Sequence, residues 1–94
     1  MTVIEISAEE FARTNKGLIT VLKAVAQAGD NGISTRKLLY KIHMTGYGQT
    51  LIHRAKTQGY IKRVPNPPEK KGGWLTINYL TPKGKRLLGL LEQL

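Results

Sequence analysis

Six polar side chains recur at helical spacing in the middle of the chain. At 100° per residue they share one arc, with Gln49 and Lys56 on its flanks and Thr50, His53, Arg54 and Thr57 at its centre. Such side chains donate and accept hydrogen bonds in patterns that match base edges in the DNA major groove. A polar arc is also the ordinary solvated side of an amphipathic helix. The arc alone leaves both interpretations open.

A short helix is predicted just before this arc. It begins at Ser34, whose hydroxyl can accept hydrogen bonds from early backbone N–H groups. Three apolar residues then share one face: Leu38, Leu39 and Ile42. The run Met44, Thr45 and Gly46 ends it. His43, near this end, is interpreted as a solvated or dipole-compensating residue.

The arc itself belongs to a second helix from about Tyr47 to Gln58. Its inner face carries Gly48, Leu51, Ile52 and Ala55, and Gly59 is expected to stop it. Two short helices joined by a tight turn form a helix-turn-helix. The stretch from Ile33 to Gly59 is therefore predicted to be one.

Positive charge is concentrated in the later part of the chain. Residues 1–33 hold three Lys or Arg against four Asp or Glu, whereas residues 34–94 hold twelve against two, so the parts carry −1 and +10. A surface that binds a polyanion explains this asymmetry better than solubility does. Membrane binding is not expected, because no basic amphipathic helix carries bulky aromatic anchors.

Composition predicts one small domain. The 94 residues are 40% hydrophobic, and a chain with only six aromatic residues must build an aliphatic core. No apolar run approaches the ~18 residues that span a bilayer, and acidic residues near the start argue against a secretory signal. We therefore expect a cytoplasmic protein, which would be nucleoid-associated if its basic part binds DNA. The absence of cysteine excludes disulfides and thiolate zinc sites.

The first third of the chain predicts an extension and a long helix. Ser7 and Glu10 form a capping box that should open a short helix through about Thr14. Thr14 or Asn15 can cap the next helix, which ends at Gly29. Its buried face carries Leu18, Ile19, Leu22, Val25 and Ala26. A turn follows, and Ile33 can pair briefly as a strand.

A hairpin is predicted after Gly59. The stretch Tyr60–Val64 alternates apolar with basic residues, so Tyr60 or Ile61 should face the core and Lys62 or Arg63 the solvent. Pro65–Gly73 can be neither helix nor central strand and should form a long tip. A second strand is expected over Trp74–Leu80.

The last helix is predicted from Pro82 to about Gln93, with Thr81 as its cap. Leucines crowd it, at positions 87, 88, 90, 91 and 94, and exceed what one small core needs to bury. Gly89 would let another helix approach closely. Together with the apolar start of the chain (Val3, Ile4, Ile6 and Phe11), these leucines predict a homodimer through the terminal segments. The alternative is that both termini pack on their own domain.

The order helix, helix, helix, strand, wing, strand, helix resembles the winged-helix branch of the helix-turn-helix proteins, over about residues 15–94. GYIKRV looks like the segment leading from the recognition helix into the first wing strand. INYLTPKGKRLL is similar to the strand-to-helix junction of small archaeal and bacterial winged-helix transcriptional regulators. The resemblance implies an α+β fold, and length and composition extend it to a single domain over 1–94. Its parts would be an N-terminal extension (1–14), a core with the wing (15–80) and a C-terminal helix for dimerisation (81–94).

The same resemblance implies binding of double-stranded DNA by a transcriptional regulator. Residues 47–58 would read the major groove, and the basic wing 65–73 would touch the backbone or minor groove. Pro65, Pro67 and Pro68 depart from a simple glycine-rich wing and stiffen it. The candidate contact residues are Ser34, Thr35, Arg36, Lys37, Tyr47, Gln49, Thr50, His53, Arg54, Lys56, Thr57, Lys62, Arg63, Lys70 and Lys71.

Other chemistries find little support. The two histidines lie ten residues apart with no acidic residue between them, so no metal site is expected. GYGQT lacks the spacing of a phosphate-binding loop. Trp74 could stack on single-stranded bases, although a strand also needs bulky residues. We expect neither an enzyme nor a cofactor.

Two alternatives to a regulator stay open: a winged-helix module that binds protein within a larger assembly, and a non-specific, chromatin-like DNA-packaging protein.

Overall fold

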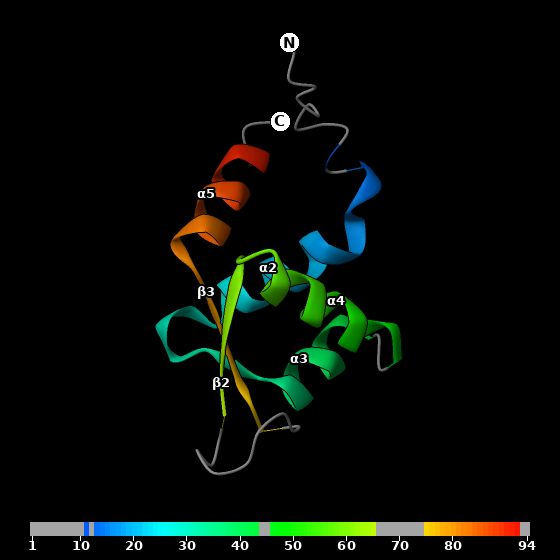
Figure 1. The fold of residues 1–94 in the computed structure, drawn as a ribbon, viewed down its shortest axis with the longest axis vertical. Coiled ribbons are helices and arrows are strands. Elements are labelled where there is room, and N and C mark those ends of the chain that lie inside the picture. Colours follow the sequence, from blue (N-terminus) through cyan, green and yellow to red (C-terminus); the bar gives the residue numbers. More distant parts are fainter. Residues whose placement is uncertain (1–10, 12, 44–45, 66–74, 93–94) are drawn as a thin grey trace.

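The computed structural model describes residues 11, 13–43, 46–65 and 75–92 (Figure 1). The elements are α2 (Lys16–Gln27), a 3₁₀ turn η1 (Gly29–Asn31), β1 (Ile33–Ser34), α3 (Thr35–Ile42), α4 (Gly46–Thr57), β2 (Ile61–Val64), β3 (Ile77–Leu80) and α5 (Pro82–Leu91). This is the predicted order. The capping box of Ser7 and Glu10, the wing tip with Lys70 and Lys71, Trp74 and Leu94 lie outside the described residues.

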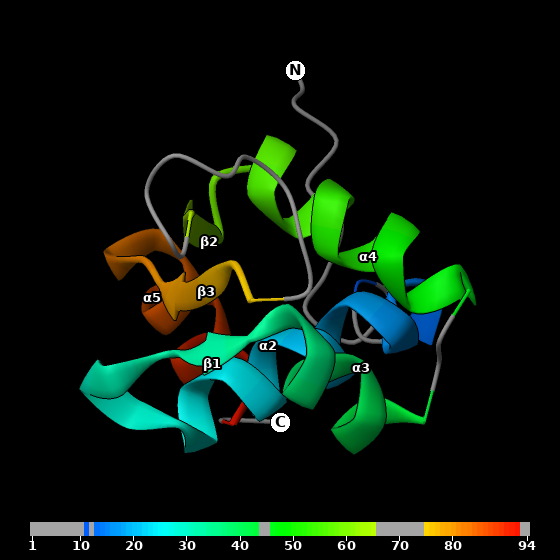
Figure 2. The same cartoon turned by 90° about the horizontal axis from the view of Figure 1, so that it is seen from below.

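Helix α2 supplies the centre of the core. Leu18, Val21, Leu22 and Val25 are buried along it, at the three- and four-residue spacing of one helical face. Helices α3 and α4 both pack against α2 (Figure 2). The core that they close is aliphatic, as composition requires, with Leu38, Leu39, Leu51, Ile52 and Ile61 among its buried members.

Asn15 stands at the N-cap position of α2, but its side chain does not cap the helix. Its Nδ2 donates instead to the Phe11 carbonyl at 3.1 Å and to the Thr14 hydroxyl at 3.0 Å. The Asn15 backbone N–H also donates to the Phe11 carbonyl. Asn15 therefore occupies the predicted cap position, but the predicted hydrogen bond from its side chain to α2 is wrong. The side chain bonds to the turn that precedes the helix.

The three strands form one antiparallel sheet in the order β1-β3-β2. The brief pairing predicted for Ile33 is confirmed, since it lies opposite Asn78. The second wing strand begins at Ile77, later than the predicted start at position 74. Ile77 pairs with Val64, and Pro65 follows Val64 without an N–H to continue the ladder.

Helix α5 begins as predicted. The Thr81 hydroxyl accepts a hydrogen bond from the Gly84 N–H at 3.1 Å, and Pro82 occupies the first turn. Leu88 is buried, whereas Leu87 and Leu91 are only partly buried. The helix ends at Leu91, two residues before the predicted end.

Two glycines of α5 provide a matched test of its docking. A Cβ on Gly84 would collide with the Tyr60 carbonyl oxygen, whereas a Cβ on Gly89 would meet no atom within 4 Å. Gly84→Ala should therefore lower the free energy of unfolding by about 1–3 kcal/mol. Gly89→Ala should raise it by about 0.5–1 kcal/mol, as glycine is a poor helix former. Urea denaturation at low protein concentration measures both, and a fully stable Gly84→Ala would contradict the close contact.

Candidate nucleic-acid interface

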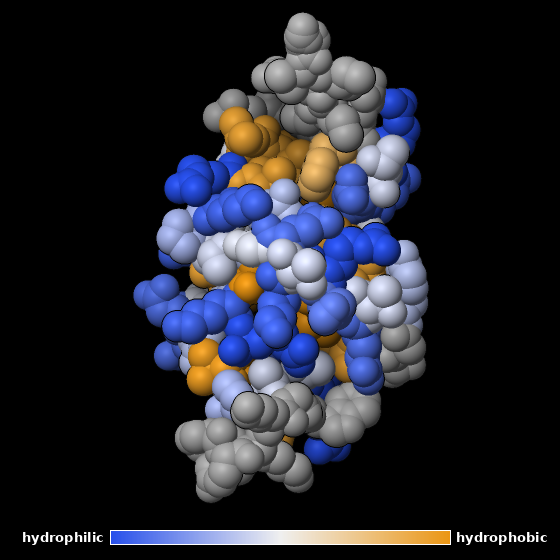
Figure 3. Space-filling model, viewed as in Figure 1, coloured by the Kyte–Doolittle hydropathy of each residue, from blue (hydrophilic) through white to orange (hydrophobic). Residues whose placement is uncertain are grey.

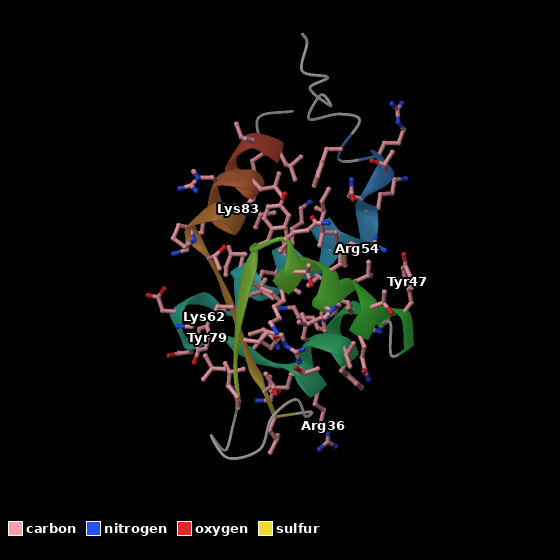
Figure 4. All side chains as sticks on the ribbon, in the orientation of Figure 1. Arg36, Tyr47, Arg54, Lys62, Tyr79 and Lys83 are labelled. Atoms are coloured by element: carbon pink, nitrogen blue, oxygen red, sulfur yellow. The ribbon has the colours of Figure 1, made fainter. Side chains whose placement is uncertain are left out.

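Helix α4 presents the polar arc to solvent. Its inner residues Leu51, Ile52 and Ala55 are buried, and Gly48 is buried with them. The outer residues are all exposed: Gln49, Thr50, His53, Arg54, Lys56 and Thr57. Tyr47 is exposed near the start of the helix, and Figure 4 shows Tyr47 and Arg54 on α4. The predicted division of this helix into two faces is confirmed.

Helix α3, which packs against α4, has a defined start and a defined end. At its start, the Ser34 hydroxyl accepts a hydrogen bond from the Lys37 N–H at 3.3 Å, which confirms the predicted cap. At its end, His43 is exposed and takes the left-handed conformation, with φ of 58°. A left-handed residue commonly ends a helix, although a residue other than glycine is strained there. His43 thus starts the turn toward α4.

The far end of α4 is closed by a Schellman motif. The Tyr60 N–H donates to the Ala55 carbonyl and the Gly59 N–H to the Lys56 carbonyl, each at 2.9 Å. Gly59 has φ of 82°, as this motif requires. The predicted stop is confirmed, and it leads the chain directly into β2.

Two side chains from the start of α5 fasten the same end of α4. Lys83 Nζ donates to the Gln58 carbonyl at 2.8 Å and lies 5.0 Å from the centre of the Tyr60 ring. The Thr81 hydroxyl donates to the Gly59 carbonyl at 2.6 Å. These bonds satisfy carbonyls that the helix leaves unpaired and put a positive charge at the negative end of its dipole. Sequence analysis missed Lys83, because its partner lies 25 residues away.

The other candidate contact residues divide into exposed and inward-facing groups. Arg36, Lys37 and Lys62 are exposed, and Figure 4 shows Arg36 at the end of the molecule to which the strands of the hairpin extend. Thr35 is buried, and Arg63 is partly buried and hydrogen-bonded inside the protein. Lys62 is therefore the solvent-facing member of the pair in β2. Lys70 and Lys71 lie outside the described residues.

An exposed apolar pair that sequence analysis missed borders the start of α3. Tyr40 is 81% exposed and Leu75 is 53% exposed. With Ser34, Arg36 and Lys37 they line a shallow groove of about 350 Å³. Tyr40 lies on the outer side of α3, opposite the apolar face, which is the one sequence signal that could have shown its exposure.

The molecular surface separates polar from apolar regions. In Figure 3 hydrophilic side chains predominate over α4 and β2, with some hydrophobic atoms between them, and the broadest group of hydrophobic atoms lies toward the upper end, near α5. In the part of the chain that the structure describes, no three His, Asp, Glu or Cys residues gather as a metal site would need. None of the helices described there is long and apolar enough to cross a membrane.

A helix-turn-helix followed by a two-stranded wing and a C-terminal helix defines a winged-helix fold. No protein-family model and no curated protein sequence matches the chain. Among solved structures, a crystal structure described as a MarR family transcription regulator matches with a TM-score of 0.71 and 18% sequence identity. The match covers 92% of this chain but only 56% of that structure. The likeness confirms the winged-helix fold.

Two left-handed residues, one at the end of each helix of the helix-turn-helix, should respond to substitution with opposite signs. His43→Gly should raise the free energy of unfolding by about 1 kcal/mol, because glycine adopts φ of 58° without strain. Gly59→Ala should lower it by about 1–2 kcal/mol, since alanine must adopt φ of 82°. Thermal denaturation followed by circular dichroism measures both changes. A loss of stability in His43→Gly would contradict the described turn.

Proposed function

We propose that this protein binds double-stranded DNA as a transcription regulator, with α4 in the major groove and the basic wing on the backbone or minor groove. The observation that carries the proposal is the outer face of α4, where six polar residues are exposed on a winged-helix scaffold. The +10 charge of residues 34–94 supports it, because phosphate contacts by Lys and Arg release condensed counterions.

The exposed residues fall into two roles. Arg54 and Thr50 lie at the centre of the arc and suit contacts to base edges, with Gln49, His53 and Thr57 beside them. Arg36, Lys37, Lys56 and Lys62 suit phosphate contacts, as do Lys70 and Lys71 in the wing. We leave Thr35 and Arg63 out of this set, because the Thr35 hydroxyl and the Nε and Nη2 of Arg63 bond within the protein.

Binding to duplex DNA should weaken steeply with salt. A protein that neutralises about five phosphates gives a log–log slope of roughly −4 to −5 by counterion release. Fluorescence anisotropy with a labelled duplex across a salt series measures the slope. Absence of binding at low salt would overturn the proposal and favour the protein-binding alternative, for which the groove beside Tyr40 and Leu75 is the candidate surface.

A matched pair of arginine variants controls this experiment. Arg54 and Arg86 are both exposed, but Arg86 belongs to α5, away from the arc of α4. On a duplex selected from a random library, Arg54→Ala should weaken binding about 5- to 150-fold, the equivalent of ~1–3 kcal/mol per base contact, and Arg86→Ala far less. Equal losses of affinity on selected and random duplexes would mean that α4 contacts only the DNA backbone and does not read bases. Failure to enrich any sequence would favour a packaging protein.

The proposed regulator works as a homodimer through its terminal segments. Leu90 is 58% exposed on α5, and Gly89 beside it has open space around it. Leu87 and Leu91 of the same helix are only partly buried. A second α5 could cover this apolar surface, and a two-fold dimer would present two α4 helices to successive major grooves, about 34 Å apart.

Sedimentation equilibrium at micromolar concentration tests the dimer. The wild-type mass should rise from 10.5 kDa toward twice that value with concentration. Leu90→Lys should keep the protein monomeric and folded, because Leu90 is already exposed in one chain. Lys85→Leu, which adds an apolar residue at another exposed position of α5, serves as a contrast and should leave the monomer–dimer equilibrium of the wild type in place. A mass that stays at 10.5 kDa would rule the dimer out.

A further inference from the structure

Arg63 turns inward from the wing and bonds to two other elements. Its Nε donates to Asn78 Oδ1 at 3.0 Å, across the β2–β3 ladder in which the two residues are paired. Its Nη2 donates to the Thr35 hydroxyl at 2.9 Å, at the first residue of α3. One guanidinium thus joins both strands of the wing to the first helix of the helix-turn-helix.

Asn78 is fully buried, with 0% exposure, so its side-chain amide must find its hydrogen-bond partners within the protein. Its Nδ2 donates to the Ile33 carbonyl at 3.0 Å and to the Thr35 hydroxyl at 3.2 Å. Both amide protons are then used, and Oδ1 accepts from Arg63. Removal of the Arg63 donor would leave this buried oxygen without the bond it has now, which is costly.

The Thr35 hydroxyl completes the network. It donates to the Thr76 carbonyl at 3.2 Å and accepts from both Arg63 and Asn78, which uses its single proton and both lone pairs. The Thr35 backbone N–H donates to the same carbonyl at 2.9 Å. The Asn78 Nδ2 also lies 3.4 Å from the Thr76 carbonyl oxygen. Residues of β1, α3, β2 and β3 therefore meet at one set of hydrogen-bonded polar atoms.

We propose that Arg63 is a positioning residue that fixes the wing against α3, so that the wing and α4 meet DNA as one preorganised surface. This inference rests on the proposed function. It gives Arg63 a role different from a phosphate contact, although the residue lies in the basic strand.

The site requires the guanidinium of arginine, and another positively charged side chain would not replace it. A planar guanidinium donates from two nitrogens in fixed directions, and a lysine ammonium cannot span both acceptors in that way. Burial lowers the pKa of the Arg63 guanidinium from its ordinary value, yet it stays protonated at neutral pH. Its two partners are an amide and a hydroxyl, so neither neutralises its charge. A direct phosphate contact would need only that charge, and this difference separates the two roles.

Two substitutions at position 63 exploit the difference. Arg63→Met keeps the apolar stem and removes the donors, and Arg63→Lys keeps the charge but loses the two-pronged bond. Both should weaken DNA binding about tenfold at 0.1 M salt, as loss of wing contacts would. Anisotropy is measured at a temperature where circular dichroism shows each variant to be folded, so that lower stability alone cannot reduce binding. Wild-type binding by Arg63→Lys would overturn the proposal, because charge would then suffice.

A double-mutant cycle supplies the decisive readout. If Arg63 acts through the wing, Lys70→Ala/Lys71→Ala should weaken wild-type binding but change Arg63→Met by less than about twofold. Arg54→Ala, the control on α4, should weaken both backgrounds equally. Additive losses for the wing lysines would overturn the positioning role.

The salt slope adds a second readout. Arg63→Met should lose roughly two units of slope, the number of wing lysines that it misplaces. No change in either slope or affinity would also overturn the positioning role. If the wild-type protein binds no duplex, the proposed DNA-binding function itself is overturned. That result differs from normal wild-type binding without an effect of Arg63, which overturns only the positioning role.

Discussion

The close approach of α4 to α2 is the contact on which the rest of the fold depends. A Cβ on Gly17 would stand 2.8 Å from a methyl group of Leu51, so α2 offers α4 a position without a side chain. Leu51 and Ile52 can then be buried almost completely. Burial of two such side chains contributes about 3–6 kcal/mol. Because the outer arc of α4 is polar, the helix has few other apolar residues to hold it. The contacts of its inner face with α2 therefore set its orientation.

Local chemistry made much of this arrangement predictable. Ser34, Gly59 and Thr81 act within a few residues of their own position, through caps and a left-handed turn, and each was placed correctly from sequence. The exposed arc of α4 followed from helical periodicity in the same way. One local prediction failed, because Asn15 bonds to the turn before it instead of capping α2, and contacts between distant parts of the chain could not be predicted at all. Arg63 reaches a hydroxyl 28 residues away, and no spacing rule distinguishes such a residue from an exposed cation.

The buried polar side chains between β2 and β3 fix the position of the strands at some cost in stability. An apolar cluster at Asn78 would tolerate small shifts of the strands, since dispersion contacts have no strict direction. The amide and hydroxyl there accept only one arrangement of donors, and every buried side-chain nitrogen and oxygen among the described residues has a partner. A short three-stranded sheet with a two-residue edge strand has little ladder to define its register. The hydrogen bonds of Asn78 help to define the register of the strands.

The strands β2 and β3 are thus held at two levels. Near α4, Thr81 and Lys83 tie the start of α5 to the carbonyls that end the helix, and nearer the tip Arg63 ties the strands to α3. A surface held in this way loses little conformational entropy when a ligand orders it, whereas each free side chain or loop immobilised at an interface costs about 0.5–1.5 kcal/mol. In the proposed DNA complex, one short helix would offer few contacts, which limits the affinity that those contacts can supply. In that complex, a fixed position of β2 and β3 relative to α4 would let the helix and the wing contribute to one binding event at a smaller entropic cost.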